Sequence, residues 1–111
     1  MKTTAIIAEF NPFHNGHKYI LDRAAKITSS DYIVVIMSGS FVQRGEPAFM
    51  HKYDRVKAAL NCGADLVLEL PVSYSTATAE TFARGAVSIV DRIGVIDDLL
   101  LFFFHVLFFF R

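Results

Sequence analysis

Short apolar runs rich in β-branched residues alternate along this chain with longer segments of helical periodicity. Apolar runs of this kind are typical of strands that are covered on both faces of a parallel sheet. Their alternation with helices predicts right-handed crossovers and an α/β fold with a doubly wound parallel sheet. We expect strands over residues 4–9, 32–37 and 66–70 and another from residues 99–101 onward, with helices over residues 17–28, 52–61 and 78–92.

Three polar clusters follow the first three expected strands, at residues 11–17, 38–45 and 71–76. Ligands of open parallel sheets bind outside the carboxyl ends of the strands. The topology therefore gathers the unusual residues of the chain along one edge of the sheet and predicts a binding site there.

The first cluster contains two histidines that flank a glycine, His14, Gly16 and His17, at a strand-to-helix turn. Glycine allows the backbone to approach a ligand closely, and a helix start offers unpaired N–H groups and a positive dipole end. Two imidazoles one turn apart can donate hydrogen bonds to oxygens that gain charge in a transition state. We interpret the turn as a site for nucleotide phosphates, with His14 and His17 as the catalytic pair.

Each residue of this turn also has a purely structural interpretation. Paired histidines at this spacing can be solvated or bonded to a helix cap, and Asn11 can shape the turn instead of contacting a ribose. Phe10 and Phe13 suit the core better than an adenine-stacking platform. Glu9 can order a histidine or a metal ion, or it can accept hydrogen bonds from the backbone at the strand end.

Length, charge and cysteine content exclude several classes of protein. The 111 residues suffice for one domain, and a formal net charge of zero gives no overall field that attracts nucleic acid. Cys62 is the single cysteine, which excludes a disulfide framework within the chain and a cysteine-based zinc site. We assign no metal ligand. The N-terminus lacks the pattern of a secretory signal, so we expect a cytoplasmic location.

Residues 99–111 form a nearly unbroken apolar run with phenylalanine triplets on both sides of His105. The run is shorter than the roughly twenty residues that cross a bilayer as a helix, and its β-propensity and low charge are typical of aggregation-prone segments. It can be a core strand, a membrane-surface anchor or sequence foreign to the original protein, and the triplets favour the last interpretation beyond about Leu101. We therefore divide the chain into a domain of residues 1–98 and an atypical tail of residues 99–111.

Several strings, in the right order, resemble the N-terminal domain of the bacterial tRNA(Met) cytidine acetate ligases, nucleotidyltransferases with a His-x-Gly-His signature. They are residues 8–17 (AEFNPFHNGH), 37–47 (MSGSFVQRGEP), 63–71 (GADLVLELP) and 79–86 (AETFARGA). The resemblance runs from about Ala5 to Gly94. It implies a Rossmann-like nucleotidyltransferase domain that is truncated here, because the family is several times longer.

The resemblance also implies an activity. The family activates acetate with ATP, giving acetyl-adenylate and pyrophosphate, and transfers the acetyl group to N4 of the wobble cytidine of elongator tRNA(Met). The sequence determines neither the oligomeric state nor whether Mg²⁺ accompanies ATP. The family's ATP-binding segment maps onto Ile7, Ala8, Glu9, Phe10, Asn11, Pro12, Phe13, His14, Asn15, Gly16, His17, Lys18, Tyr19 and Ile20.

Further positive charge lies outside that segment. The planar guanidinium of Arg44 suits a second anion contact, and a solvated surface arginine is an equally good interpretation. Lys52, Arg55 and Lys57 can contact the tRNA backbone or form an ordinary charged helix face.

The end of the domain departs from the family's pattern. The family continues the fourth strand into a glycine-containing turn that contacts ATP, and Phe102 or its neighbours occupy that place. A phenylalanine there obstructs the approach of the backbone to a nucleotide, so we expect this chain alone to be inactive or impaired. Two alternatives stay open: an enzyme that moves AMP or CMP to a small phosphorylated acceptor, and a non-catalytic fragment that binds nucleotide.

Overall fold

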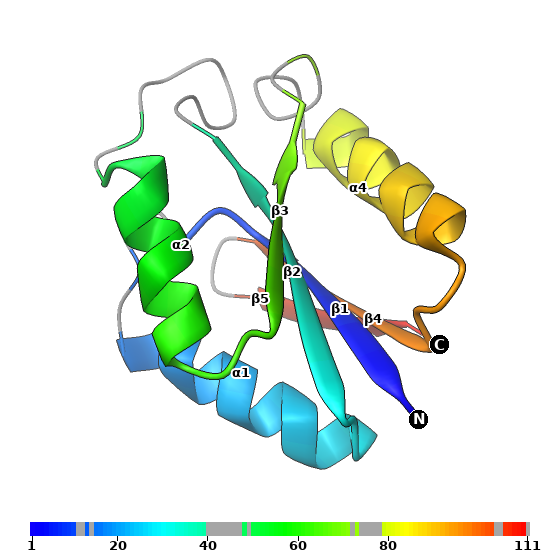
Figure 1. The fold of residues 1–111 in the computed structure, drawn as a ribbon. Helices are drawn as coiled ribbons and strands as arrows, with labels where there is room; N and C mark the ends of the chain where they lie inside the picture. The colour runs from blue at the N-terminus through cyan, green and yellow to red at the C-terminus, as the bar shows by residue number, and fades with distance from the viewer. Residues whose placement is uncertain are drawn as a thin grey trace.

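The computed structural model describes residues 1–10, 13, 15–39, 48, 50–71, 73, 79–103 and 106–110, with the backbone alone for Ala79, for Phe82 and from residue 101 onward. Strands and helices alternate along these residues up to the fourth strand (Figure 1). The elements are β1 (Thr3–Ala8), α1 (Asn15–Thr28), β2 (Tyr32–Ser38), α2 (Lys52–Asn61), β3 (Leu66–Leu70), α4 (Ala79–Ile93), β4 (Asp98–Phe103) and β5 (Val106–Phe110).

Within the described residues, the strands form one sheet in the order β3-β2-β1-β4-β5. The first four pair in parallel, β1 with β2 and β4, and β2 with β3. This confirms the predicted doubly wound parallel sheet. The tail backbone adds β5 antiparallel to β4, a pairing that the sequence pattern did not predict. The division of the chain at residue 98 and the foreign origin of the tail stay predictions.

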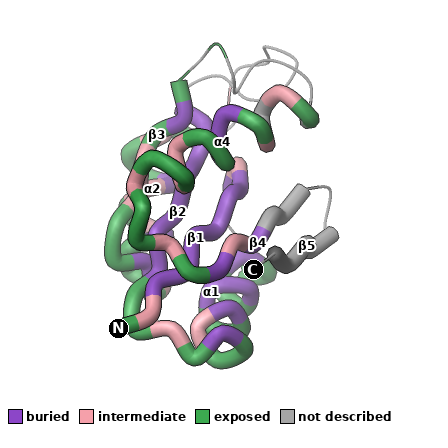
Figure 2. The backbone as a smooth tube through the Cα atoms, turned by 90° about the vertical axis from the view of Figure 1, so that its right-hand side faces the viewer, coloured by how far each residue is buried: buried purple, intermediate pink, exposed green. Residues whose placement is uncertain are grey.

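Helices cover both faces of the sheet, with α1 and α2 on one face and α4 on the other (Figure 1). Alternate side chains of β1 enter the two halves of the core, because successive residues of a strand point to opposite faces. Ile6 packs in the cluster that contains Leu21 of α1, whereas Ile7 packs in the cluster that contains Ala86 of α4. All of β1 is buried, and Figure 2 shows it purple together with most of β2.

Two glycines follow helices in backbone conformations that other residues rarely adopt. Gly63 has a φ of +118° just after the C-cap of α2, and Gly94 has a φ of +76° just after α4. Glycine lacks the Cβ that makes these conformations costly, and it is favoured directly after a helix. Both glycines therefore allow the chain to leave its helix at these positions.

Candidate functional site

The strand-to-helix turn after β1 begins with two buried residues and a sharp change of direction. Ile7 and Ala8 are fully buried at the carboxyl end of β1, and Glu9 is half-buried. Phe10 then adopts a φ of +53° while only 1% of its surface is exposed. A positive φ is costly for a residue with a Cβ, and such strain is concentrated at functional turns.

His17 lies in the first turn of α1, with 6% of its surface exposed. Its ring centroid is 4.9 Å from that of Phe10, edge-on at 66°, and 5.6 Å from that of Phe13. The two phenylalanine rings contact each other edge-on at 5.0 Å. These contacts hold the imidazole in one orientation, and they make Phe10 a core residue, as the sequence favoured. His14 lies outside the described residues, so the pairing of the two imidazoles stays a prediction.

The other described residues of the expected ATP-binding segment differ in how far they are buried. The described first turn of α1 holds no acidic side chain, and Gly16 is exposed there, so the positive end of the helix dipole can meet an anion. Asn15, Lys18 and Tyr19 are exposed, Phe13 is half-buried, and Ile20 faces the core. Asn11 and Pro12, like the predicted anion contact Arg44, lie outside the described residues.

Arg55 corrects the expectation that the cations of α2 all face solvent. It has no exposed surface and donates hydrogen bonds to carbonyl oxygens on three chain segments. Nη1 lies 2.9 Å from the carbonyl oxygen of Glu9 and 2.9 Å from that of Ser38, and Nη2 donates to the carbonyl of Gly39. Nε lies 2.9 Å from the carbonyl oxygen of Met50. Arg55 is therefore neither a tRNA contact nor part of a solvated face.

This arrangement couples the carboxyl ends of β1 and β2 to the segment that leads into α2. Burial lowers the pKa of Arg55, and the nearby carboxylates of Glu9 and Glu69 raise it in part. A guanidinium stays charged in proteins and offers five donors in a rigid fork. It can therefore donate to several backbone carbonyls at once where parallel strands end.

A cavity of about 240 Å³ lies between α2 and the strands β2 and β3. Its wall includes Lys52 of α2 and Glu69 of β3, which form an ion pair at 3.3 Å. Lys57, further along α2, is exposed and lines no part of this cavity. His51 accepts a hydrogen bond from the backbone N–H of Tyr53 at 3.2 Å and so caps the start of α2.

A second cavity, of about 360 Å³, lies at the amino end of β4, where α4 ends. Its lining includes Asp91, Asp97 and Asp98. Among the described residues, no group of three or more histidine, cysteine or acidic side chains is placed to hold a metal ion. Within the same part of the chain, no helix has the length and apolar character needed to span a membrane.

The model of one protein family, described as HIGH Nucleotidyl Transferase, matches residues 1–103. The chain belongs to this family. Its match extends from β1 through β4 and includes the β1–α1 turn, which agrees with the Rossmann-like nucleotidyltransferase domain expected from the sequence.

Several similar proteins share one name within the HIGH nucleotidyl transferases. A tRNA(Met) cytidine acetate ligase of Pediococcus pentosaceus is 54% identical over 94 residues, which cover 85% of this chain and 26% of the relative. The ligase of Acetivibrio thermocellus is 55% identical over 97 residues, which cover 87% of this chain and 23% of the relative. The chain thus spans about a quarter of the length of the curated relatives that it matches.

Solved structures lead to the same family. The crystal structure of Thermotoga maritima TmcAL bound with alpha-thio ATP superposes with a TM-score of 0.85 at 48% sequence identity. The match covers 89% of this chain and 24% of that one. The apo form of the same protein also superposes with a TM-score of 0.85.

Sequence analysis missed the buried structural role of Arg55, and it did not single out Glu69. Both are charged residues that interrupt apolar patterns, Arg55 one turn before the buried Ala59 and Glu69 inside the strand Leu66–Leu70. A charged residue at a position where the helical or strand period predicts burial indicates that its side chain has a specific bonding partner. That signal could have found Arg55, whereas Glu69 lies on an edge strand, where exposed charges are common.

Proposed function

We propose that this chain is the ATP-binding part of a tRNA(Met) cytidine acetate ligase. In the whole protein, ATP and acetate would form acetyl-adenylate and pyrophosphate, and the acetyl group would pass to N4 of the wobble cytidine of elongator tRNA(Met). The observation that carries the proposal is the 48% identity, over 89% of the chain, to a protein crystallised with an ATP analogue. The substrates favour the cytoplasm as the site of the reaction.

The proposed chemistry is an in-line displacement at the α-phosphorus. A carboxylate oxygen of acetate attacks the phosphorus, the bond to the bridging oxygen breaks, and pyrophosphate leaves with its electron pair. Catalysis of such a step relies on positioning and on stabilising the spreading negative charge. We assign this stabilisation to His14 and His17, close backbone approach to Gly16, and a second anion contact to Arg44.

The described geometry supports the role of His17 in two ways. Its position in the first turn of α1 brings it to the end of the helix that attracts phosphate. Its contacts with Phe10 and Phe13 fix the ring before the substrate arrives, so little reorganisation is needed during reaction. Residues 7–20 as a whole are proposed to enclose ATP.

A substrate screen tests the proposal. The chain is incubated with ATP and either acetate or a small phosphorylated acceptor, and pyrophosphate release is measured. Release that depends on acetate supports the ligase. Release that depends only on the phosphorylated acceptor would instead identify an AMP-transferring enzyme, the alternative left open by the sequence.

Because we expect impaired turnover from this chain alone, ATP binding is measured in parallel. ATP should raise the melting temperature, since a ligand that binds only the folded state stabilises it by mass action. ATP binding without turnover would identify a fragment that binds nucleotide. A chain whose melting temperature ATP leaves unchanged would contradict the proposal at its first step.

A further inference from the structure

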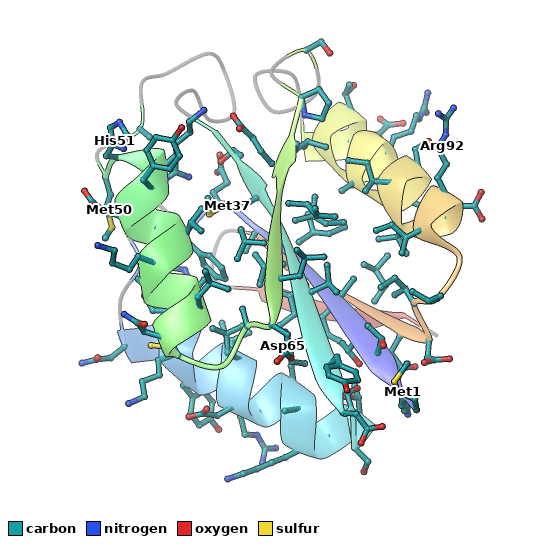
Figure 3. The ribbon with its side chains drawn as sticks, viewed as in Figure 1. Met1, Met37, Met50, His51, Asp65 and Arg92 are labelled. Carbon is teal, nitrogen blue, oxygen red and sulfur yellow. The ribbon has the colours of Figure 1, made fainter. Side chains whose placement is uncertain are left out.

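The cavity beside α2 has an apolar floor and a polar rim. Met37, Val56 and Val67 line it from β2, α2 and β3, while Lys52 and Glu69 contribute charged groups. Figure 3 shows Met37 between α2 and β2, toward the end of the molecule where His51 lies, with Asp65 at the other end of β3. An apolar cavity with a few convergent polar groups is the usual form of a small-molecule site.

The charged pair on the rim keeps bonding capacity for a ligand. Lys52 Nζ lies 3.3 Å from both carboxylate oxygens of Glu69, and the two side chains are 28% and 52% exposed. An ammonium has three donors and a carboxylate about four acceptor positions, so this pair leaves a donor and an acceptor side by side. A ligand edge that carries an acceptor beside a donor matches them.

Gly39 lets the carboxylate of Glu69 reach this position. A Cβ built on Gly39 would lie 2.8 Å from the carboxyl carbon of Glu69, closer than such atoms approach. Gly39 is buried at the end of β2, and its carbonyl oxygen accepts from Arg55. Arg55, which also donates to the Glu9 carbonyl just after β1, therefore bonds the backbone against which Glu69 lies.

An aromatic side chain completes the cavity. Tyr53 lines it with 68% of its surface exposed, and the ring of His51 lies 5.2 Å away at a tilt of 32°. Lys52 Nζ lies 5.5 Å from the centre of the Tyr53 ring. Exposed aromatic rings beside cations are the groups on which proteins stack unpaired bases.

The cavity also lies near the strand-to-helix turn that precedes His17. It opens on β2 and β3, and β3 lies two strands from β1 in the sheet. Neighbouring strands are spaced about 4.8 Å apart, so the carboxyl end of β3 lies about 10 Å from that of β1. A base bound there would be close to the nucleotide proposed at the β1–α1 turn.

We propose that this cavity binds the base of the acceptor cytidine, stacked on Tyr53, with Glu69 accepting from its exocyclic amino group and Lys52 donating to the neighbouring ring acceptor. The inference rests on the proposed function, which supplies cytidine as the acceptor. A carboxylate that accepts from N4 of cytosine is a known mode of base readout. Uracil presents a carbonyl oxygen at the same place, which a carboxylate repels.

The test is a titration of the isotope-labelled chain with free cytidine and, separately, with uridine and adenosine, followed by NMR of the backbone amides. Cytidine should shift the amides of Gly39, Tyr53 and Glu69, with uridine bound at least about tenfold more weakly. Glu69→Gln should weaken cytidine binding by about tenfold, because it removes a hydrogen bond to a charged acceptor. Binding of uridine as strong as that of cytidine at these amides would overturn the assignment.

Glu80→Gln is the matched control. Glu80 pairs with Arg84 at the same 3.3 Å, but it lies exposed on α4 and lines no part of the cavity. Its variant should bind cytidine like the unchanged chain, and the amide spectrum reports whether each variant is folded. Equal loss in both variants, or no cytidine shift at all, would refute the proposal. The titration contains neither ATP nor acetate, so a failure of acetate activation would leave its result readable.

Discussion

At the residue scale, Arg55 joins three chain segments whose carbonyl groups all need donors. Replacing it by methionine keeps an unbranched side chain of similar length and removes every donor, so the carbonyls of Glu9, Ser38 and Met50 lose the hydrogen bonds that Arg55 donates. Each buried polar group without a partner costs about 1–3 kcal/mol. We expect Arg55→Met to lower the free energy of unfolding by about 3 kcal/mol or more, measured by urea denaturation.

Two further variants separate the geometry of Arg55 from its charge. Arg55→Lys keeps the charge but loses the planar fork, so it should recover part of the stability. Lys57→Met removes an exposed cation from the same helix and should change stability by less than about 0.5 kcal/mol. If Arg55→Met and Lys57→Met lose equal stability, the hydrogen bonds of Arg55 contribute nothing specific.

His17 is the residue whose predicted chemistry the described geometry best supports. His17→Ala removes a proposed donor to phosphate, and ATP affinity should fall by about tenfold or more. We expect the ATP-induced rise in melting temperature to shrink in this variant. Any acetate-dependent pyrophosphate release should slow by about a hundredfold, because a donor to the transition state is lost.

His51→Ala is the control for this measurement. It removes the cap of α2, so its melting temperature without ATP should fall. The rise caused by ATP should remain, since His51 lies outside the β1–α1 turn. A full ATP-induced rise in His17→Ala would exclude the role that we assign to His17.

The sequence predicted a role for His17 but did not predict the role of Arg55. The glycine and histidines of the turn form a local signal, from which the sequence alone predicts a role for His17. Arg55 depends on contacts with Glu9 and Ser38, which are distant in the sequence. The apolar residues Val56, Ala59 and Leu60 indicate one buried face of α2, yet Leu60 is 44% exposed while Arg55 is fully buried.

At the scale of elements, the same aspartate contact recurs at the amino ends of three strands. Asp31, Asp65 and Asp97 each precede a strand: Asp31 bonds Lys2, just before β1, and the other two bond a residue of a neighbouring strand. Asp65 Oδ2 accepts from the backbone N–H of Ile33 at 2.8 Å, and its own N–H donates to the Ile33 carbonyl at 2.8 Å. Asp97 makes both contacts with Thr3, at 2.9 and 2.8 Å. These pairs fix the register of each added strand.

Asp65→Ala should therefore loosen the start of β2 and β3 locally. Loss of a hydrogen bond to a carboxylate costs about 1.5–3 kcal/mol, and amide hydrogen exchange should accelerate at Ile33 but not at Thr3. Asp97→Ala should give the reverse pattern. Asp22→Ala, an exposed change on α1, should alter neither amide. Uniform acceleration in both strand variants would indicate global destabilisation instead of a register contact.

The elements themselves were largely predictable, and their pairing partly so. Runs such as residues 32–37 are largely apolar, which is typical of a strand buried on both faces. The expected helix over residues 52–61 also has the bounds of α2. The antiparallel pairing of β5 was missed because the same apolar composition suits a core strand, an anchor or foreign sequence. Pairing direction depends on the turn between two strands, and apolar composition alone does not specify it.

At the scale of the whole molecule, the two edges of the sheet differ in how they are protected. In the described part of the chain, β3 is one edge and carries Glu69, with Pro71 directly after it. Charge and proline on an edge strand discourage pairing with another chain. The other edge is β5, whose residues Val106–Phe110 include no charge. An uncharged apolar edge of high β-propensity is a template for association between copies.

We therefore expect the chain to associate through β5 in a concentration-dependent way. Phe109→Lys places a charge on that edge, and sedimentation velocity should then show a shift from larger species toward the 12.4 kDa monomer.

Val95→Lys is the matched control, because Val95 is 63% exposed but lies outside the strands, so it should leave association unchanged. A monomer at all concentrations, or an equal effect of both lysines, would show that β5 does not drive association. Since β5 pairs with β4, and β4 with β1, a charge that disrupted the sheet would also weaken the ATP binding that we propose at the β1–α1 turn. The ATP-induced rise in melting temperature of Phe109→Lys thus separates a change at the edge from damage to the fold.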